Sequence, residues 1–156
     1  MDLLPGPVTV IVKRRKHAPL AAELNPGVDS IGIRVPDNDF IREVRGGTRI
    51  RGTEGDGTAA RDPNAIPQVC RQHDGAIALT SANLSGGTSP LEVSEFQELW
   101  PALASVFDEG PLAPNRAGST IVDLTEPGSF KIVRDGSALG MVLELLQDKH
   151  KLRRRQ

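Results

Sequence analysis

The chain has 156 residues, of which 38% are hydrophobic and 25% are charged, and its formal net charge is -1. This length suits one globular domain, and the composition excludes a disordered or collagen-like protein. One cysteine and three histidines exclude an internal disulfide and a structural zinc site, which favours a reducing intracellular compartment. The few aromatic rings disfavour a protein dedicated to single-stranded nucleic acid.

The first part of the chain predicts two strands. The segment MDLLPGPVTVIVKRR has an acidic residue at position 2 and two prolines, which argues against a secretory signal or stable membrane insertion. Within it, the β-branched run Val8–Val12 predicts a buried strand. The segment Ser30–Pro36 alternates apolar residues with Gly32 and Arg34, so we expect a second strand that holds Arg34 on one face.

A long polar segment interrupts the predicted helix that begins near Asp39. Residues Arg45–Gln68 are dense in Gly, Thr, Arg and Asp and have almost no apolar side chains. Such a segment cannot bury enough surface to become ordered, so we expect a flexible insertion. Its glycines lack the GK[ST] sequence of a phosphate-binding loop, which disfavours that interpretation.

The second half of the chain predicts alternating strands and helices. The expected elements are a strand at Gly75–Thr80, a helix at Pro90–Leu103, a short strand at Ser105–Phe107, a loop at Gly110–Gly118, strands at Ser119–Leu124 and Lys131–Arg134, and an amphipathic helix at Ala138–Leu152. This alternation predicts an α/β fold, a twisted mixed sheet with flanking helices. The basic run Lys149–Arg155 indicates a frayed helix end, with RNA phosphate contact as the alternative.

Three predicted strand ends carry small hydroxyl or amide residues beside glycine. They are Leu79–Gly86 (LTSANLSG), Gly118–Thr120 and Val133–Gly136. In α/β sheets, ligands bind beyond strand ends, where backbone N–H groups and short hydroxyl side chains converge. We therefore expect a shared cleft for an anionic ligand, although each segment alone could be an ordinary turn or helix cap.

Two arginines on otherwise apolar strands, Arg34 and Arg134, also indicate an anionic ligand. A guanidinium group matches a carboxylate or phosphate in a bidentate manner. The alternative is a structural ion pair with Asp37 or Asp123. No Ser-His-Asp triad is predicted, because the histidines lie in polar or terminal segments.

Five segments form an ordered set along the chain: LLPGPVTVIV (3–12), SIGIRVPDNDF (30–40), LTSANLSG (79–86), GSTIVDL (118–124) and KIVRDGSAL (131–139). In order and spacing they resemble the YrdC-like family of L-threonylcarbamoyl-AMP synthases, and EFQELWPALASVFDEGP is similar to a helix and loop of animal members. The resemblance implies condensation of ATP, bicarbonate and L-threonine to threonylcarbamoyl-adenylate and pyrophosphate, with Mg²⁺ on the phosphates. The product would serve the tRNA-modification machinery that makes threonylcarbamoyladenosine.

The resemblance also implies roles for individual residues. Ser81 and Asn83 match the SxN half of the family's KxR...SxN signature and are the expected catalytic residues. The implied ATP contacts are Ser30, Ser81, Asn83 and Arg134, the implied threonine contacts are Arg34, Leu79 and Ser119, and no side chain is expected to bind the metal directly.

Two departures from the family pattern shape the expected domain organisation. The N-terminal third with the KxR motif is missing, and residues 45–68 are extra, so we expect a partial, incomplete YrdC-like domain at 1–152 and a basic tail at 153–156. Such a chain is expected to have weak or no synthase activity alone. The alternative function is weak double-stranded RNA binding by a non-catalytic module, and a third possibility is a carbamoyl-adenylate domain like those of hydrogenase maturation proteins. The expected compartments are the cytoplasm and mitochondria.

Overall fold

The structure is a computed structural model that describes residues 2–16, 20–21, 23–37, 77–103, 106, 108, 110–112, 114 and 116–156. The chain divides into two compact units, one formed by residues 1–37 and 117–156 and the other by residues 38–116. The expected helix near Asp39 and the expected insertion at 45–68 lie outside the described residues. In the described part of the chain, no helix is long and apolar enough to cross a membrane.

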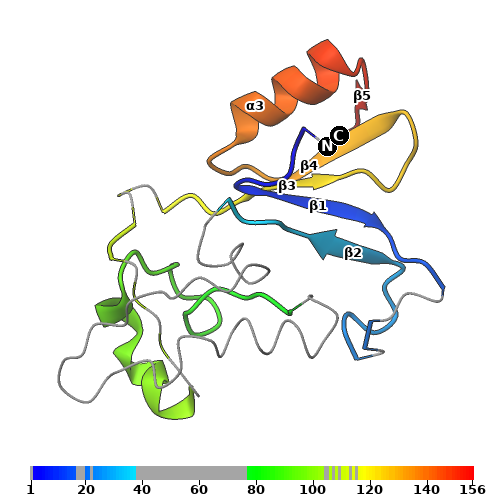
Figure 1. The fold of residues 1–156 in the computed structure, drawn as a ribbon. Coiled ribbons are helices and arrows are strands. Elements are labelled where there is room, and N and C mark those ends of the chain that lie inside the picture. Colours follow the sequence, from blue (N-terminus) through cyan, green and yellow to red (C-terminus); the bar gives the residue numbers. More distant parts are fainter. Residues whose placement is uncertain are drawn as a thin grey trace, which may run out of the picture. The chain divides into compact units, whose positions relative to one another are not determined.

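The first unit contains a five-stranded mixed sheet with the strand order β2-β1-β3-β4-β5 (Figure 1). Its strands are β1 (Val8–Lys13), β2 (Ser30–Ile33), β3 (Thr120–Asp123), β4 (Ser129–Arg134) and β5 (Arg153–Arg154). The strand β1 pairs in parallel with β3 and antiparallel with β2, while β4 pairs antiparallel with β3 and in parallel with β5. The predicted mixed α/β sheet is confirmed.

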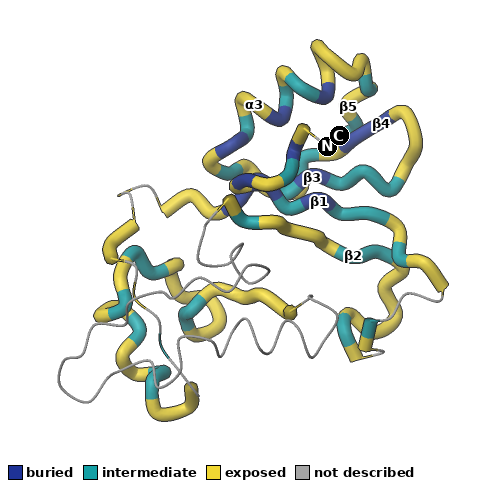
Figure 2. The backbone as a smooth tube through the Cα atoms, viewed as in Figure 1, coloured by how far each residue is buried: buried dark blue, intermediate teal, exposed yellow. Residues whose placement is uncertain are grey.

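The core lies on one face of this sheet, under the C-terminal helix. Because side chains alternate along a strand, β1 buries Val8 and Val10 and β3 buries Val122 on the same side. The helix α3 (Leu139–Leu143) continues into the π-helical segment η3 (Glu144–Lys149), and Val142 and Leu146 from these segments complete the core (Figure 2). Full burial of one such side chain contributes about 1.5–3 kcal/mol, so these side chains stabilise the packing of the helical segment on the sheet.

The C-terminal helix ends earlier than predicted, and the prediction of a frayed basic helix end is wrong. The helical segment ends at Lys149, and Lys151 adopts a φ of 53° that turns the chain back. Arg153–Arg154 then pairs with Ser129–Phe130 as β5, so residues 153–156 do not form a free tail. Arg155 is 19% exposed at its side chain and makes ion pairs with Asp123, at 3.3 Å, and Glu126, at 2.7 Å, which explains why the basic run stays on the sheet.

The second unit differs from its predicted elements. Residues 77–80 are exposed and have no regular structure, so the predicted strand Gly75–Thr80 is wrong over its described part. No described strand pairs with this segment, and Leu79 is 65% exposed. The predicted helix at 90–103 is instead the 3-10 helix η2 (Val93–Ala102), with a kink at Phe96 and with Pro101 inside it. Of the predicted strand Ser105–Phe107, only Val106 is described, and it has no regular structure.

Candidate functional site

The sequence-predicted site residues of the first unit lie on the sheet face opposite α3. Thr9 alternates with the buried Val8 and Val10, and Ser119 has the same strand parity as Ile121, whose partner across the β3–β4 ladder is Arg134. The hydrogen bond between the Thr9 and Ser119 hydroxyls, 2.9 Å long, places both on that face. This polar face is formed where β1 and β3 begin and β4 ends.

Ser119 and Arg134, two residues predicted from separate strand ends, are in direct contact. Arg134 donates to the Ser119 carbonyl oxygen from Nε, at 3.1 Å, and from Nη2, at 2.8 Å. Nη2 also donates to the Ser119 hydroxyl oxygen, at 3.1 Å. These bonds hold the guanidinium plane in one orientation, while Nη1 makes none of them. The guanidinium group of the exposed Arg134 is therefore held in place, and its Nη1 hydrogens are left to donate to a ligand.

Two glycines allow this contact. A side chain at Gly118 would place its Cβ 2.8 Å from Arg134 Nη2, so the guanidinium would have to move from its present position. A Cβ at Gly136 would overlap the backbone of residues 118–120. Beside this close approach, the Ser137 N–H donates to the Gly118 carbonyl oxygen and the Ala138 N–H donates to Thr120 Oγ1, both at 3.1 Å. The two glycine-containing strand ends are thus bound to each other.

Arg34 and Ser30 lie on the neighbouring strand, at different ends of it. The strand β2 ends at Ile33, earlier than the predicted end at Pro36, so Arg34 follows the strand end directly and is exposed. Arg34 lies two residues after Gly32 and so points to the same side of the sheet. A Cβ at Gly32 would lie 3.3 Å from Thr9 Cγ2, so this side is the polar face. Ser30 is opposite Lys13, four residues from Arg34 and roughly 13 Å away along an extended strand. Arg34, not Ser30, is therefore near Thr9 and Ser119.

The proposed structural partner Asp123 is engaged elsewhere. Its carboxylate accepts hydrogen bonds from the Thr125 N–H and hydroxyl group and pairs with Arg155. Burial opposes ionisation of Asp123, but these bonds from Thr125 and the charge of Arg155 outweigh it and lower its pKa. The alternative in which Asp123 neutralises Arg134 is therefore wrong.

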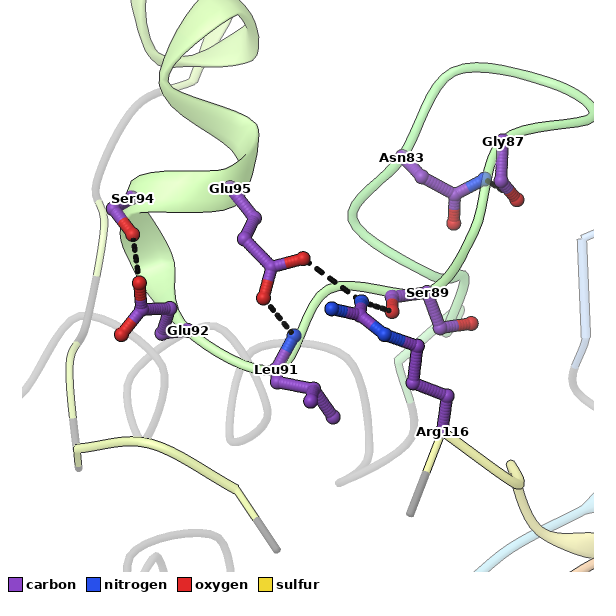
Figure 3. Close-up of polar contacts among 8 residues, drawn as sticks. All are labelled: Asn83, Gly87, Ser89, Leu91, Glu92, Ser94, Glu95 and Arg116. Atoms are coloured by element: carbon purple, nitrogen blue, oxygen red, sulfur yellow. Dashed lines mark hydrogen bonds and ion pairs between the residues drawn. The ribbon is translucent and has the colours of Figure 1, made fainter. Parts of the chain in front are cut away.

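In the second unit, the SxN segment forms a tight turn held by Asn83. Asn83 Nδ2 lies beside Gly87, to whose carbonyl oxygen it donates at 3.0 Å (Figure 3). It also donates to the Leu84 carbonyl oxygen, at 2.7 Å, and Gly86 has a φ of 83°. Both hydrogens of this amide group are therefore used within the turn. Its Oδ1 atom is buried and has no hydrogen-bond partner in the described part of the chain. Ser81 is exposed, as are Leu79, Thr80 and Ser85, so the Ser81 hydroxyl is accessible to a ligand.

A polar network beside the turn contains an arginine that sequence reasoning missed. Arg116 Nη1 donates to the Ser89 carbonyl oxygen and to Glu95 Oε2, both at 2.8 Å (Figure 3). Glu95 Oε1 accepts from the Leu91 N–H at 3.1 Å. The hydrogen bond from Arg116, followed by that from Leu91, lowers the pKa of Glu95 below its usual value. This network joins η2 to the chain that leaves the SxN turn.

The structure brings together two of the three predicted strand ends. Residues 118–120 and 133–136 meet in the first unit, whereas residues 79–86 belong to the second unit. A cleft shared by all three stays a prediction. Thr9 was also missed, and the only sequence signal for it is a hydroxyl residue in an otherwise aliphatic run, at the alternate position to Val8 and Val10.

The described residues contain no group of three or more His, Cys, Asp or Glu side chains that could hold a metal ion. His150 lies 3.5 Å from Asp2, which also pairs with Lys149 at 2.7 Å, so this histidine belongs to a surface cluster. His17, His73 and Cys70 lie outside the described residues. The chemistry of the described site is therefore that of arginine, hydroxyl and amide groups.

These features define an α/β protein with a mixed sheet whose polar face gathers an arginine and hydroxyl groups at strand ends, an arrangement suited to anionic ligands. The Sua5/YciO/YrdC family model, described as "Telomere recombination", matches residues 1–136, and the chain belongs to this family. The expected family resemblance is confirmed.

Named relatives extend this assignment. The chain is 38% identical to a threonylcarbamoyl-AMP synthase of Homo sapiens over 97% of its own length and 46% of the relative's. It is 30% identical to a putative threonylcarbamoyl-AMP synthase of Methanocaldococcus jannaschii over 85% of its length and 48% of the relative's. The chain thus spans about half the length of the curated relatives it matches.

The fold is similar to solved structures of the family. P. abyssi Sua5 complexed with L-threonine matches with a TM-score of 0.65 and 20% identity, over 98% of this chain and 36% of that chain. The H234A/Y235A form of P. abyssi Sua5 matches with a TM-score of 0.63. These matches confirm the predicted YrdC-like fold, and they give no support to the RNA-binding alternative.

Proposed function

We propose that this chain forms a substrate-binding part of a threonylcarbamoyl-AMP synthase. The reaction joins L-threonine, bicarbonate and ATP to give threonylcarbamoyl-adenylate, pyrophosphate and water. The relatives that are 38% identical carry this name, and the similar P. abyssi structure is of a complex with L-threonine. The tRNA-modification machinery would then consume the adenylate, in the cytoplasm or in mitochondria.

The observation that carries this proposal is the Ser119–Arg134 contact. Its three hydrogen bonds orient a guanidinium group on a sheet face, with the Nη1 edge left over. A guanidinium in fixed orientation loses little entropy when it binds a carboxylate or phosphate oxygen. In this proposal Arg134 binds a phosphate of ATP, and Arg34, exposed on the same face, binds the threonine carboxylate.

The SxN turn would supply hydroxyl and backbone donors to the nucleotide phosphates. Ser81 is exposed and can donate its proton, while Asn83 spends both amide hydrogens on the carbonyl oxygens of Leu84 and Gly87. We therefore assign phosphate contact to Ser81 and the shaping of the turn to Asn83. Leu79, exposed ahead of the turn, would contribute its backbone to threonine binding, and Ser30 a hydroxyl to the nucleotide.

Mg²⁺ would enter with ATP. In this proposal its ligands are the phosphate oxygens and water. Bound in this way, Mg²⁺ would neutralise phosphate charge. The contribution of the chain is then positioning and charge stabilisation: arginines orient the two anionic substrates, and hydroxyl and N–H groups stabilise charge at the phosphate under attack.

Ligand titration and pyrophosphate release together test the proposal. We expect calorimetric binding of both L-threonine and ATP, with the affinity for ATP weakened about tenfold by loss of a charged hydrogen-bond donor in Arg134→Met. The matched control is Arg153→Met, an exposed arginine on β5, which should bind like the unmodified chain. Any pyrophosphate release should require threonine, bicarbonate and ATP together. If the unmodified chain binds neither ligand, the proposal is overturned.

A further inference from the structure

The Thr9 hydroxyl lies at hydrogen-bonding distance from a predicted site residue, and nothing in the proposed function uses it. Thr9 Oγ1 is 2.9 Å from Ser119 Oγ, and either atom could donate. The Ser119 hydroxyl is also 3.1 Å from Arg134 Nη2. Thr9, Ser119 and Arg134 thus form a continuous hydrogen-bonded row across β1, β3 and β4.

The hydrogen-bonding capacity of Ser119 limits what this row can do. A serine hydroxyl has one proton to donate and two lone pairs that accept. Arg134 can only donate, so it occupies one of the lone pairs. One proton and one lone pair remain, and Thr9 takes one of these two. The other is left for a ligand.

The direction of the Thr9–Ser119 bond decides which ligand Ser119 can bind. If Ser119 donates to Thr9, only a lone pair remains, and it repels a carboxylate or phosphate oxygen. If Thr9 donates to Ser119, the Ser119 proton remains available to an anionic oxygen. Ser119 is only 7% exposed, so water offers little replacement for a wrongly directed bond.

We propose that Thr9 is a positioning residue that donates its hydroxyl proton to Ser119, so that Ser119 donates to an anionic oxygen of the substrate. The anionic oxygen belongs either to the threonine carboxylate or to a phosphate of ATP. This inference rests on the proposed function for the identity of the substrates. The Thr9–Ser119–Arg134 row itself exists without a ligand and can be tested alone.

Two substitutions at position 9 separate the hydroxyl from the shape of the side chain. Thr9→Val keeps the branched shape and removes the hydroxyl, whereas Thr9→Ser keeps the hydroxyl and removes the methyl group. Thr125→Val is the matched control, because it removes another threonine hydroxyl, which donates to Asp123 Oδ1 away from Ser119.

Calorimetric titrations with L-threonine and with ATP, run separately, measure the effect on binding. We expect Thr9→Val to weaken one of the two ligands about fivefold, the usual net worth of a hydrogen bond, and the ligand affected identifies the source of the anionic oxygen. Thr9→Ser should restore the affinity, and Thr125→Val should leave it unchanged. Unchanged binding in Thr9→Val, or equal losses in Thr9→Val and Thr9→Ser, overturns the inference and leaves the proposed function standing.

A ligand-free measurement separates failure of this inference from failure of the proposed function. Solvent exchange of the Arg134 Nη2 protons, followed by NMR, reports how firmly the Ser119 hydroxyl holds the guanidinium. With the Thr9 hydroxyl gone, we expect this exchange to become about fivefold faster, with recovery in Thr9→Ser. If the unmodified chain binds neither ligand, the proposed function fails, and this exchange rate alone then decides whether Thr9 positions the row; an unchanged rate refutes it.

Discussion

Gly136→Ala tests whether the close contact between two strand ends builds the candidate site. An added Cβ would overlap the backbone of residues 118–120, and backbone cannot move aside as a flexible side chain can. The loop at 135–138 would therefore move away and weaken the bonds from the Ser137 N–H to the Gly118 carbonyl oxygen and from the Ala138 N–H to Thr120 Oγ1.

The expected cost follows from these contacts. Overpacking costs typically about 1–3 kcal/mol, and each lost hydrogen bond costs about 1 kcal/mol. Since the two effects relieve each other in part, we expect Gly136→Ala to lower the free energy of unfolding by about 2–4 kcal/mol. Because Arg134 precedes this loop and bonds to Ser119, affinity for the anionic substrates should fall as well.

Urea unfolding followed by circular dichroism measures this change, with Gly140→Ala as the control. Gly140 lies in α3, and a Cβ there would meet nothing within 4 Å. Alanine in place of a helical glycine is expected to stabilise by about 0.5–1 kcal/mol. If Gly136→Ala unfolds at the same urea concentration as Gly140→Ala, the reasoning about the close approach is refuted.

Three further predictions concern the polar contacts around the sheet and the SxN turn. The pKa of Asp123 is lowered in the folded chain, so the ionised carboxylate stabilises the fold above the unfolded pKa of about 3.9, and this stability is lost as the pH falls through the folded pKa. Urea titrations below about pH 4 should therefore show a smaller loss of stability in Asp123→Asn than in the unmodified chain. An equal loss in the two chains would contradict this. Arg155→Met removes both ion pairs of Arg155, the residue that follows β5. It should lower the free energy of unfolding by about 1–2 kcal/mol and speed amide exchange at position 155, whose N–H donates to the Phe130 carbonyl oxygen, whereas Arg153→Met should change neither. Arg116→Met releases the Ser89 carbonyl oxygen and Glu95, so the Glu95 pKa measured by NMR should rise toward its usual value; no rise would mean that the pair does not form in solution.

Much of the sheet could be predicted because its strands carry strong local signals. Val8–Val12, Ser119–Leu124 and Lys131–Arg134 are rich in β-branched residues, and each forms a strand within a residue or two of its expected bounds. The strand at Gly75–Thr80 was predicted from the same kind of run, but apolar composition alone does not supply a pairing partner. Tertiary context decided against that strand.

The C-terminal segment could not be predicted from local pattern. Lys151 has a positive φ without being glycine, so no sequence signal marks the turn that sends Arg153–Arg154 back to β4. Arg155 is held by Asp123 and Glu126, residues about 30 positions away in the sequence. An arginine run is usually a solvated surface, and only the long-range ion pairs make this one part of the sheet.

The candidate site was predicted in part for a physical reason. Ser119 and Arg134 were found because hydroxyl residues and arginines beside glycine at strand ends are suited to anions, and the antiparallel pairing of β3 with β4 brings them together. Thr9 escaped because its importance depends on the neighbour chosen by parallel pairing of β1 with β3. Pairing between distant strands is not encoded in any single segment.

The most direct test of the central claim maps where the substrates bind. NMR titrations with L-threonine and with ATP should shift backbone amide signals at residues 30–34, 118–120 and 133–136, with little change in α3 on the opposite face. The shifts should weaken in Arg134→Met and persist in Arg153→Met. Saturating ligand that leaves the polar face unperturbed, or that shifts α3 instead, would contradict the assignment of this face as the substrate-binding part of the synthase.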